Sequence, residues 1–184
     1  MNSKVTHINV GNLAENCWFL ANEDTKEAVV IDPGAVPDRI CAAAEKHGWK
    51  ITAILLTHGH IDHMGACESL RTELGVKVYA LTEEEDLLLD AKKNLSVFIE
   101  RKVVTFEPDE RLRDGQELKL AGMKSQVIHT PGHTPGGCSD YVADAGCVFS
   151  GDTLFAESVG RSDFPGGSTS ALVRAVKEKL FLLP

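Results

Sequence analysis

Short apolar segments rich in Val, Ile and Phe recur along this chain, and each is closed by Gly, Pro, Asn or Asp. They cover residues 17–21, 28–31, 51–56, 76–80 and 126–128. Segments of this length and composition between turn-forming residues are typical of β-strands. A chain of 184 residues is long enough to bury a core around such strands. We therefore expect one domain, residues 1–184, built around buried strands.

Helical patterns lie between the apolar segments. Pro and Asp open the stretch 37–47, and a glycine follows both this stretch and the stretch 64–74, as is common at helix ends. The acidic stretch 83–90 favours a helix N-terminus, and a last helix is expected over residues 169–182. The pair Asp114-Gly115 predicts a hairpin turn. Strands that alternate with helices indicate an α/β or mixed domain.

Charge and composition exclude several classes of protein. The formal net charge is −8 and the Lys and Arg residues form no cluster, which disfavours a nucleic-acid partner. The five cysteines include no C-x-x-C pair, so neither a disulfide framework nor a cysteine zinc site is indicated. No apolar run has the length of a signal peptide core or a membrane span. We expect a soluble, cytoplasmic protein with no membrane partner.

Three apolar stretches run directly into residues that can bind a metal ion. These residues are His58, His60, Asp62 and His63 after residues 51–57, His133 after VIHT, and Asp152 after CVFSG. Side chains alternate along an extended segment, so the first three can point the same way while His63 turns in as a helix begins. A single H-x-H pair is commoner in an ordinary surface turn, but the whole cluster predicts a metal site. Imidazole nitrogen and carboxylate oxygen suit zinc, and also iron or manganese.

The motifs HGHIDH, HTPGHTPGG and SGDTLF around these residues resemble those of the metallo-β-lactamase superfamily, over nearly the whole chain. The segment GRSDFPGG at residues 160–167 resembles the glyoxalase II-like, or hydroxyacylglutathione hydrolase-like, branch. The resemblance implies an αββα sandwich of two mixed sheets packed face to face, with helices outside. It also implies that the C-terminal strand and helix of that branch are missing.

The resemblance further implies how the six residues share their metals. Metal 1 would be bound by His58, His60 and His133, metal 2 by Asp62 and His63, and Asp152 would bridge them. Members of the branch continue past a K-L-F-x-L-P sequence to a P-G-H-G turn whose histidine completes metal 2, whereas this chain ends at Pro184. We therefore expect one or two zinc ions, with iron or manganese as alternatives, and a weaker second site.

The function implied by the resemblance is hydrolysis of a small-molecule thioester of the hydroxyacylglutathione type. A metal-bound hydroxide would attack the carbonyl, and Asp62 would orient it and assist its deprotonation. An aspartate at position 152, where known β-lactamases carry a cysteine or another residue, favours a thioesterase. One alternative is a persulfide dioxygenase-like enzyme with a single iron on His58, His133 and Asp152. The other is an inactive metal-binding fragment, whose exposed apolar patch would favour a homodimer.

Residues near the predicted ligands suggest supporting roles. Thr57, Ser150 and Thr153 are candidate hydrogen-bond partners for the metal-binding histidines. His129 is expected to be structural. Arg161 is expected either to form an ion pair with Asp163 or to contact an anionic substrate.

Overall fold

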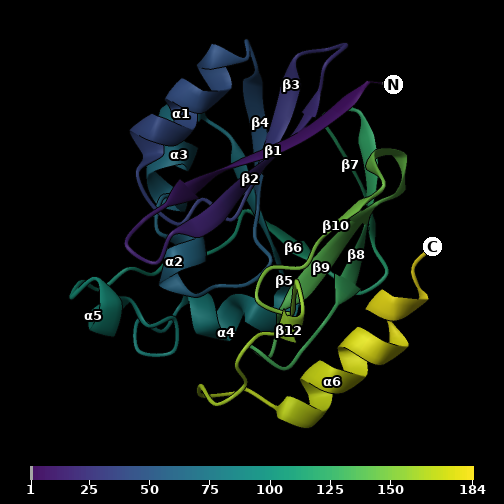
Figure 1. Cartoon of the computed structure of the whole chain (residues 1–184). Helices are drawn as coiled ribbons and strands as arrows, with labels where there is room; N and C mark the ends of the chain where they lie inside the picture. The colour runs from purple at the N-terminus through teal and green to yellow at the C-terminus, as the bar shows by residue number, and fades with distance from the viewer. Residues whose placement is uncertain (1) are drawn as a thin grey trace.

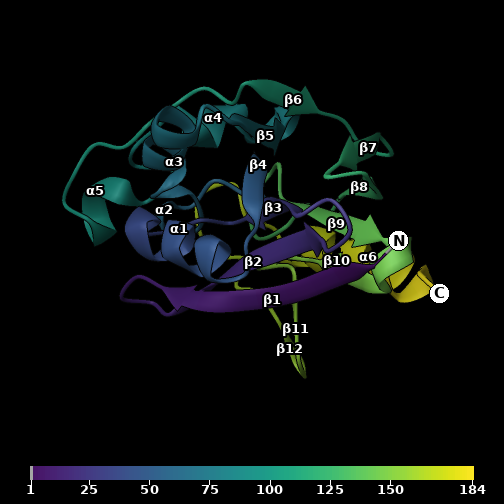
Figure 2. The same ribbon diagram turned by 90° about the horizontal axis from the view of Figure 1, so that it is seen from above.

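The computed structural model describes residues 2–184, in which two β-sheets pack face to face between helices (Figures 1 and 2). A sheet with two apolar faces needs a covering layer on each, and here one face of each sheet meets the other sheet while the second face meets helices. The predicted αββα sandwich is therefore confirmed.

The larger sheet has the strand order β1-β2-β3-β4-β5-β6. Its strands are β1 Ser3–Val10, β2 Glu15–Asn22, β3 Glu27–Ile31, β4 Lys50–Leu55, β5 Lys77–Leu81 and β6 Glu110–Leu112. The first three strands are antiparallel, whereas β3 to β6 run parallel. The carboxyl ends of these parallel strands consequently lie at one edge of the sheet, which is where α/β proteins place their ligands.

The smaller sheet has the order β10-β9-β8-β7 and is antiparallel throughout, so in detail only the larger sheet is mixed. Its strands are β7 Glu117–Leu120, β8 Met123–His129, β9 Cys138–Val142 and β10 Cys147–Phe149. A two-stranded ribbon of β11 Leu154–Phe155 and β12 Ser158–Val159 follows. Because β8 and β10 both run antiparallel to β9, they end on the same side of the sandwich.

Alternate side chains of the larger sheet enter two different cores. On β3, Val29 and Ile31 pack between the sheets, while Val30 packs under the helices. On β4, Leu55 lies between the sheets and Ile54 faces the helices. Because these strands are buried on both faces, their sequences are unbroken apolar runs rather than alternating apolar and polar residues.

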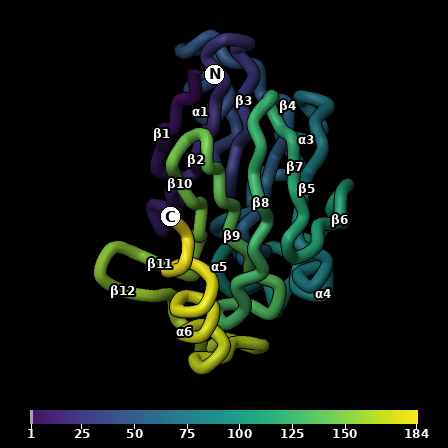
Figure 3. Tube along the Cα trace, turned by 90° about the vertical axis from the view of Figure 1, so that its right-hand side faces the viewer, coloured from purple at the N-terminus to yellow at the C-terminus, as the bar shows by residue number. Residues whose placement is uncertain are grey.

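Helices cover both outer faces. The helical segments are α1 Pro37–Lys46, α2 Ile61–Met64, α3 Cys67–Leu74, η1 Thr82–Glu84, α4 Glu85–Leu88, α5 Ser96–Ile99, η2 Ala143–Ala145, α6 Thr169–Glu178 and η3 Leu180–Leu182. Val176 of α6 and Leu180 pack against Ile128 of the smaller sheet, the side of the molecule seen in Figure 3. Ser168 caps the N-terminus of α6 by accepting a hydrogen bond from the backbone of Ala171. Across residues 2–184, no helix is long and apolar enough to cross a membrane.

The single helix predicted over residues 64–74 is broken in the structure. Helix α2 ends at Met64 and α3 starts only at Cys67. The amide of Ala66 between them donates to the carbonyl of Pro33 at 2.8 Å. A Cβ at Gly65 would lie 2.2 Å from the oxygen of Gly34, so two backbone segments meet here without a side chain between them.

The prediction of a hairpin at Asp114-Gly115 is wrong. Strand β6 before the turn pairs with β5, whereas β7 after it pairs with β8, so this turn carries the chain from one sheet to the other. It docks on β8, because Asp114 Oδ1 accepts from the amide of His129 at 2.8 Å and Gly115 donates to the carbonyl of Val127 at 2.9 Å. Tertiary hydrogen bonds thus decide the path of this turn.

Candidate metal centre

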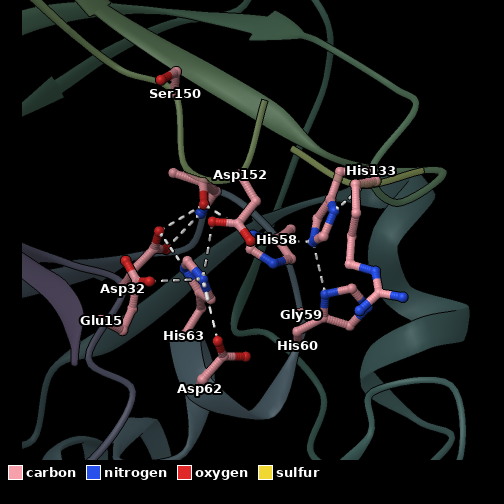
Figure 4. Close-up of polar contacts among 12 residues, drawn as sticks. Glu15, Asp32, His58, Gly59, His60, Asp62, His63, His133, Ser150 and Asp152 are labelled. Atoms are coloured by element: carbon pink, nitrogen blue, oxygen red, sulfur yellow. Dashed lines mark hydrogen bonds and ion pairs between the residues drawn. The ribbon is translucent and has the colours of Figure 1, made fainter. Parts of the chain in front are cut away.

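Strand ends from both sheets meet at one end of the sandwich and bring together all six residues predicted from the sequence. The list comprises His58, His60, Asp62 and His63 beyond β4, His133 beyond β8 and Asp152 beyond β10 (Figure 4). His60 lies in extended backbone at the start of α2, whereas Asp62 and His63 already belong to that helix. The rigid sandwich therefore positions side chains that lie on short loops and one helical turn.

His58, His60 and His133 form the first group, which we call the three-histidine group. One ring nitrogen of each lies within 4.8 Å of the others, and all three side chains are buried. His133 Nδ1 donates to the backbone oxygen of Arg161 at 2.7 Å, which leaves the lone pair of Nε2 facing His60 Nδ1 at 2.9 Å. Burial, followed by the charges of neighbouring histidines, lowers the pKa of His60 to about 3 and that of His58 well below its usual value. Both rings are therefore neutral at pH 7, the form that binds metals.

Asp152 lies between this group and His63. One carboxylate oxygen is 3.5 Å from His133 Nε2 and the other is 3.4 Å from His63 Nε2. Burial raises the pKa of Asp152, but contact with His63 and the charges of the nearby histidines outweigh that effect and lower it. Asp152 is thus an ionised carboxylate at neutral pH that faces both groups.

His63 is surrounded by carboxylates. Its Nδ1 donates to Asp32 Oδ2 at 2.9 Å, while Nε2 faces Glu15 Oε2 at 3.4 Å and Asp62 Oδ2 at 3.8 Å, in addition to Asp152 (Figure 4). Complete burial alone would lower the pKa of His63, yet the surrounding carboxylates raise it well above the usual value. This pocket therefore stabilises positive charge at the position of His63 Nε2.

The residues fit a divalent metal ion. The Nε2 atoms of His58, His60 and His63 are buried and have no hydrogen-bond partner among residues 2–184, which is costly unless another ligand satisfies them. The donor atoms are only nitrogen and oxygen, the set that zinc, iron and manganese accept. His58, His60, His133 and Asp152 are therefore the candidate ligands of a first ion, with Asp62 and His63 beside them.

Asp32 supports the site from behind and was not predicted. It follows β3, and its carboxylate accepts hydrogen bonds from the backbone amide and hydroxyl of Thr57 at 2.8 and 2.6 Å as well as from His63. The Thr57 hydroxyl also lies 3.2 Å from His58 Nδ1, which agrees with the prediction that Thr57 is a hydrogen-bond partner of a candidate metal-binding histidine. An aspartate at the end of an apolar strand, followed by Pro-Gly, is the signal by which Asp32 can be found in the sequence.

The other two candidates for supporting roles lie elsewhere. Ser150 donates to the backbone oxygen of Leu154, and the Thr153 hydroxyl contacts that of Thr130, so neither side chain reaches a histidine. His129 contacts the carbonyl oxygen of Pro135 through Nε2 at 2.8 Å, away from the candidate ligands. Proximity in sequence was therefore a poor guide here, because both hydroxyls make hydrogen bonds within or beside the turn after β10.

Glu84 joins the two loops that carry the three-histidine group. Its buried carboxylate accepts from the amide of Gly59 at 2.8 Å and from the amide of Gly136 at 2.8 Å. A Cβ at Gly136 would lie 2.2 Å from the backbone nitrogen of Glu84, so the loop rests directly on η1. Burial raises the pKa of Glu84 to about 7, although these amide hydrogen bonds oppose the shift. No motif marks Glu84 in the sequence, since both partners are distant along the chain.

The loop over residues 160–167 closes one side of the three-histidine group. The ring of Phe164 lies edge-on to His60, with centroids 5.3 Å apart. The guanidinium carbon of Arg161 lies over the Phe164 ring, 4.1 Å from its centroid, and Arg161 forms a two-pronged ion pair with Asp163, both contacts being 2.7 Å. Of the two roles expected for Arg161, the structure contains the ion pair.

A cavity of about 490 Å³ opens beside the carboxylates. Glu15, Asp32 and Asp152 line its polar end, and Trp18 and Phe149 line its apolar walls. A small organic molecule fits a space of this size, and such pockets commonly combine apolar walls with a few polar groups. Of the six candidate ligands, Asp152 lines this cavity, so a small molecule bound there would lie next to its carboxylate.

Two relatives resemble this chain over most of their length. A probable metallo-hydrolase of Bacillus subtilis, YqgX, is 38% identical over 95% of this chain and 82% of its own. The hydroxyacylglutathione hydrolase GloC of Haemophilus influenzae is 34% identical over 92% of this chain and 80% of its own.

Two solved structures share the fold. The B3 metallo-beta-lactamase BLEG-1 superposes with a TM-score of 0.92 at 35% identity, covering 98% of this chain and 87% of its own. TTHA1623, solved in a di-iron-bound form, gives a TM-score of 0.83 at 35% identity, covering 97% and 87%. The relatives thus include different named activities on one architecture, so the architecture alone does not decide the substrate.

The whole-chain comparison agrees with the site. A family model described as the metallo-beta-lactamase superfamily matches residues 10–182. This range contains all the candidate ligands and every strand except part of β1. Together with the relatives above, the match shows that this chain belongs to the metallo-beta-lactamase superfamily.

Proposed function

We propose that this chain is a thioester hydrolase of the glyoxalase II-like branch, acting on hydroxyacylglutathione-like substrates with zinc as its metal. The observation that carries the proposal is the carboxylate of Asp152, which lies 3.5 Å from His133 and 3.4 Å from His63. The candidate donors are nitrogen and oxygen atoms, and Asp152 would serve both groups of ligands, as the resemblance of GRSDFPGG to this branch implies. The similarity to GloC supports the same substrate class.

When bound, a divalent metal supplies an activated water at neutral pH and polarises an acyl carbonyl. The chain's own residues provide the remaining functions. Asp62 is partly exposed at the site and is suited to orient the attacking water and accept its proton. Phe164 lies against His60 of the three-histidine group, and the cavity beside Asp152 offers room for the acyl group. A thiolate is a good leaving group, so the absence of a dedicated acid among these residues costs little.

The test is hydrolysis of S-lactoylglutathione by separately prepared zinc, iron and manganese forms, with release of the free thiol followed by a thiol reagent. We expect turnover by at least one form, and a fall of at least about a hundredfold in kcat for Asp62→Asn. Asp144→Asn, which changes an exposed aspartate on η2, serves as the matched control and should leave the rate unchanged.

The same preparations should be offered a β-lactam and a glutathione persulfide. Opening of the lactam without thioester cleavage would favour the activity in the name of BLEG-1 and contradict the proposal. Oxygen uptake by the iron form on the persulfide would contradict it in favour of a dioxygenase. Stoichiometric metal without any turnover would indicate a metal-binding protein that is not an enzyme.

A further inference from the structure

We propose that Glu15 is a ligand of a second divalent metal ion, which it binds together with Asp62, His63 and Asp152. The inference depends on the metal centre of the proposed function but not on the identity of the substrate. Neither the sequence motifs nor the resemblance assigns a role to Glu15, which is the first residue of β2.

The distances around His63 Nε2 match the spacing of metal ligands. The oxygens of Glu15 and Asp152 are each 3.4 Å from this nitrogen, and that of Asp62 is 3.8 Å away. Four ligands at 2.0–2.2 Å from a tetrahedral ion are separated from one another by about 3.4 Å. The Asp32 contact on the other side of the ring is 2.9 Å, an ordinary hydrogen bond. The Nε2 side of His63 is therefore spaced for an ion rather than for direct hydrogen bonds.

The unpartnered nitrogen is an independent observation. His63 is fully buried, and within the described part of the chain its Nε2 makes no hydrogen bond although it faces three carboxylates. A buried polar atom without a partner is rare in folded proteins and calls for a ligand. Nδ1 is engaged by Asp32, which fixes the ring so that Nε2 faces Glu15 and Asp62 (Figure 4).

The charge of Glu15 also requires a partner. Its carboxylate is largely withdrawn from solvent next to Asp32 and Asp152, and within residues 2–184 its one ion-pair contact is His63. No Lys or Arg among the described residues pairs with Glu15, Asp62 or Asp152. Like charges at this separation repel, and a divalent cation among them would offset the repulsion.

Asp32 is the other carboxylate near His63, but its oxygens are already engaged. Oδ1 accepts from the Thr57 amide, and Oδ2 accepts from both the Thr57 hydroxyl and His63 Nδ1. Among residues 2–184, Glu15 makes no comparable set of side-chain hydrogen bonds, and it lines the open cavity. It is therefore the carboxylate that is free to act as the fourth ligand.

The experiment counts metal ions. The metal-free chain is titrated with Zn²⁺ and, separately, Co²⁺ against a chromophoric chelator, and bound metal is measured by elemental analysis after dialysis. We expect two equivalents per chain for the unmodified protein. Glu15→Gln should weaken the second equivalent by at least about tenfold and leave the first unchanged. Glu27→Gln, on the neighbouring strand β3, is the matched control and should retain both equivalents.

A second variant separates loss of a ligand from loss of structure. Glu15→His replaces the carboxylate with another zinc ligand and should retain two equivalents, with a changed Co²⁺ absorption spectrum because nitrogen replaces oxygen. Circular dichroism checks that every variant is folded. The proposal is overturned if the unmodified protein binds a single equivalent, or if folded Glu15→Gln binds both equivalents with unchanged affinity. If two ions bind as described but no thioester is cleaved, the proposed function fails while this inference stands.

Discussion

Asp140 on β9 is a buried carboxyl group that should make the stability of this protein fall as pH rises. Neither of its oxygens has a hydrogen-bond partner in the part of the chain that the structure describes, and the adjacent void of about 10 Å³ is about the smallest that can hold one water molecule. Apart from Ser125, the surrounding side chains are apolar. Burial, and then the charge of Asp32, raises the pKa of Asp140 to about 8.

The sign and size of the effect follow from this shift. The unfolded chain ionises Asp140 near the ordinary value of 3.8, whereas the folded chain keeps it protonated up to about 8. The destabilisation that Asp140 causes is therefore absent below the unfolded-state pKa. It grows by about 1.4 kcal/mol per pH unit between the two pKa values and is constant above the folded-state pKa. From about pH 5 to about pH 8 the loss amounts to roughly 3 to 4 kcal/mol as an upper estimate.

Asp140→Asn removes the ionisation and keeps the shape. Its buried amide still lacks partners, which costs about 1–3 kcal/mol. The free energy of unfolding of the variant, relative to that of the unmodified protein, should therefore increase only as pH rises. Urea unfolding of the metal-free chains at several pH values measures the difference in free energy of unfolding, in which the other titrating groups cancel. Asp144→Asn, which changes an exposed residue nearby, should run parallel to the unmodified protein. Parallel profiles for Asp140→Asn as well would refute the reasoning.

Three further predictions follow from the packing and the metal centre. A glutamine at position 84 can accept from only one of the two amides that Glu84 joins. In a chelator competition, Glu84→Gln should therefore lower the metal affinity of the three-histidine group at least about tenfold, whereas the control Glu83→Gln should leave it unchanged. Leu70→Ala, at a fully buried position, should cost about 2–5 kcal/mol in urea unfolding, whereas Leu74→Ala, at a side chain 37% exposed, should cost under about 1 kcal/mol. Removal of metal with a chelator should lower the thermal midpoint, and readdition of Zn²⁺ should restore it; an unchanged midpoint would contradict metal binding by the folded chain.

The part of the fold that could be predicted from sequence is the part governed by local pattern. Apolar segments with turn residues at their ends correspond to β2, β3, β4, β5 and β8, and glycine marks the end of α3 as expected. The six candidate ligands follow strand ends, so a single rule located them all. The prediction of a hairpin at Asp114-Gly115 was wrong because these two residues favour a turn whether the flanking strands pair with each other or with different neighbours.

The residues that escaped prediction act across the fold. Glu84 meets amides that are 25 and 52 positions away in sequence, and its carboxylate looks like any surface glutamate until η1 is placed against both loops. Glu15 reaches His63 only because β2 and α2 are neighbours in the folded chain. Contacts of this kind depend on how the layers stack, and no spacing in the sequence carries that information.

The candidate ligands come from both sheets: His58 and His60 follow a strand of the larger one, and His133 and Asp152 follow strands of the smaller one. An ion held by all four would tie the two layers together in the folded chain alone. At free metal a thousand times the dissociation constant, such binding stabilises a protein by about 4 kcal/mol. Because proteases degrade chains that open, the metal supply of the cell would set the lifetime of each copy. Metal starvation would then clear the protein from the cell rather than leave it idle.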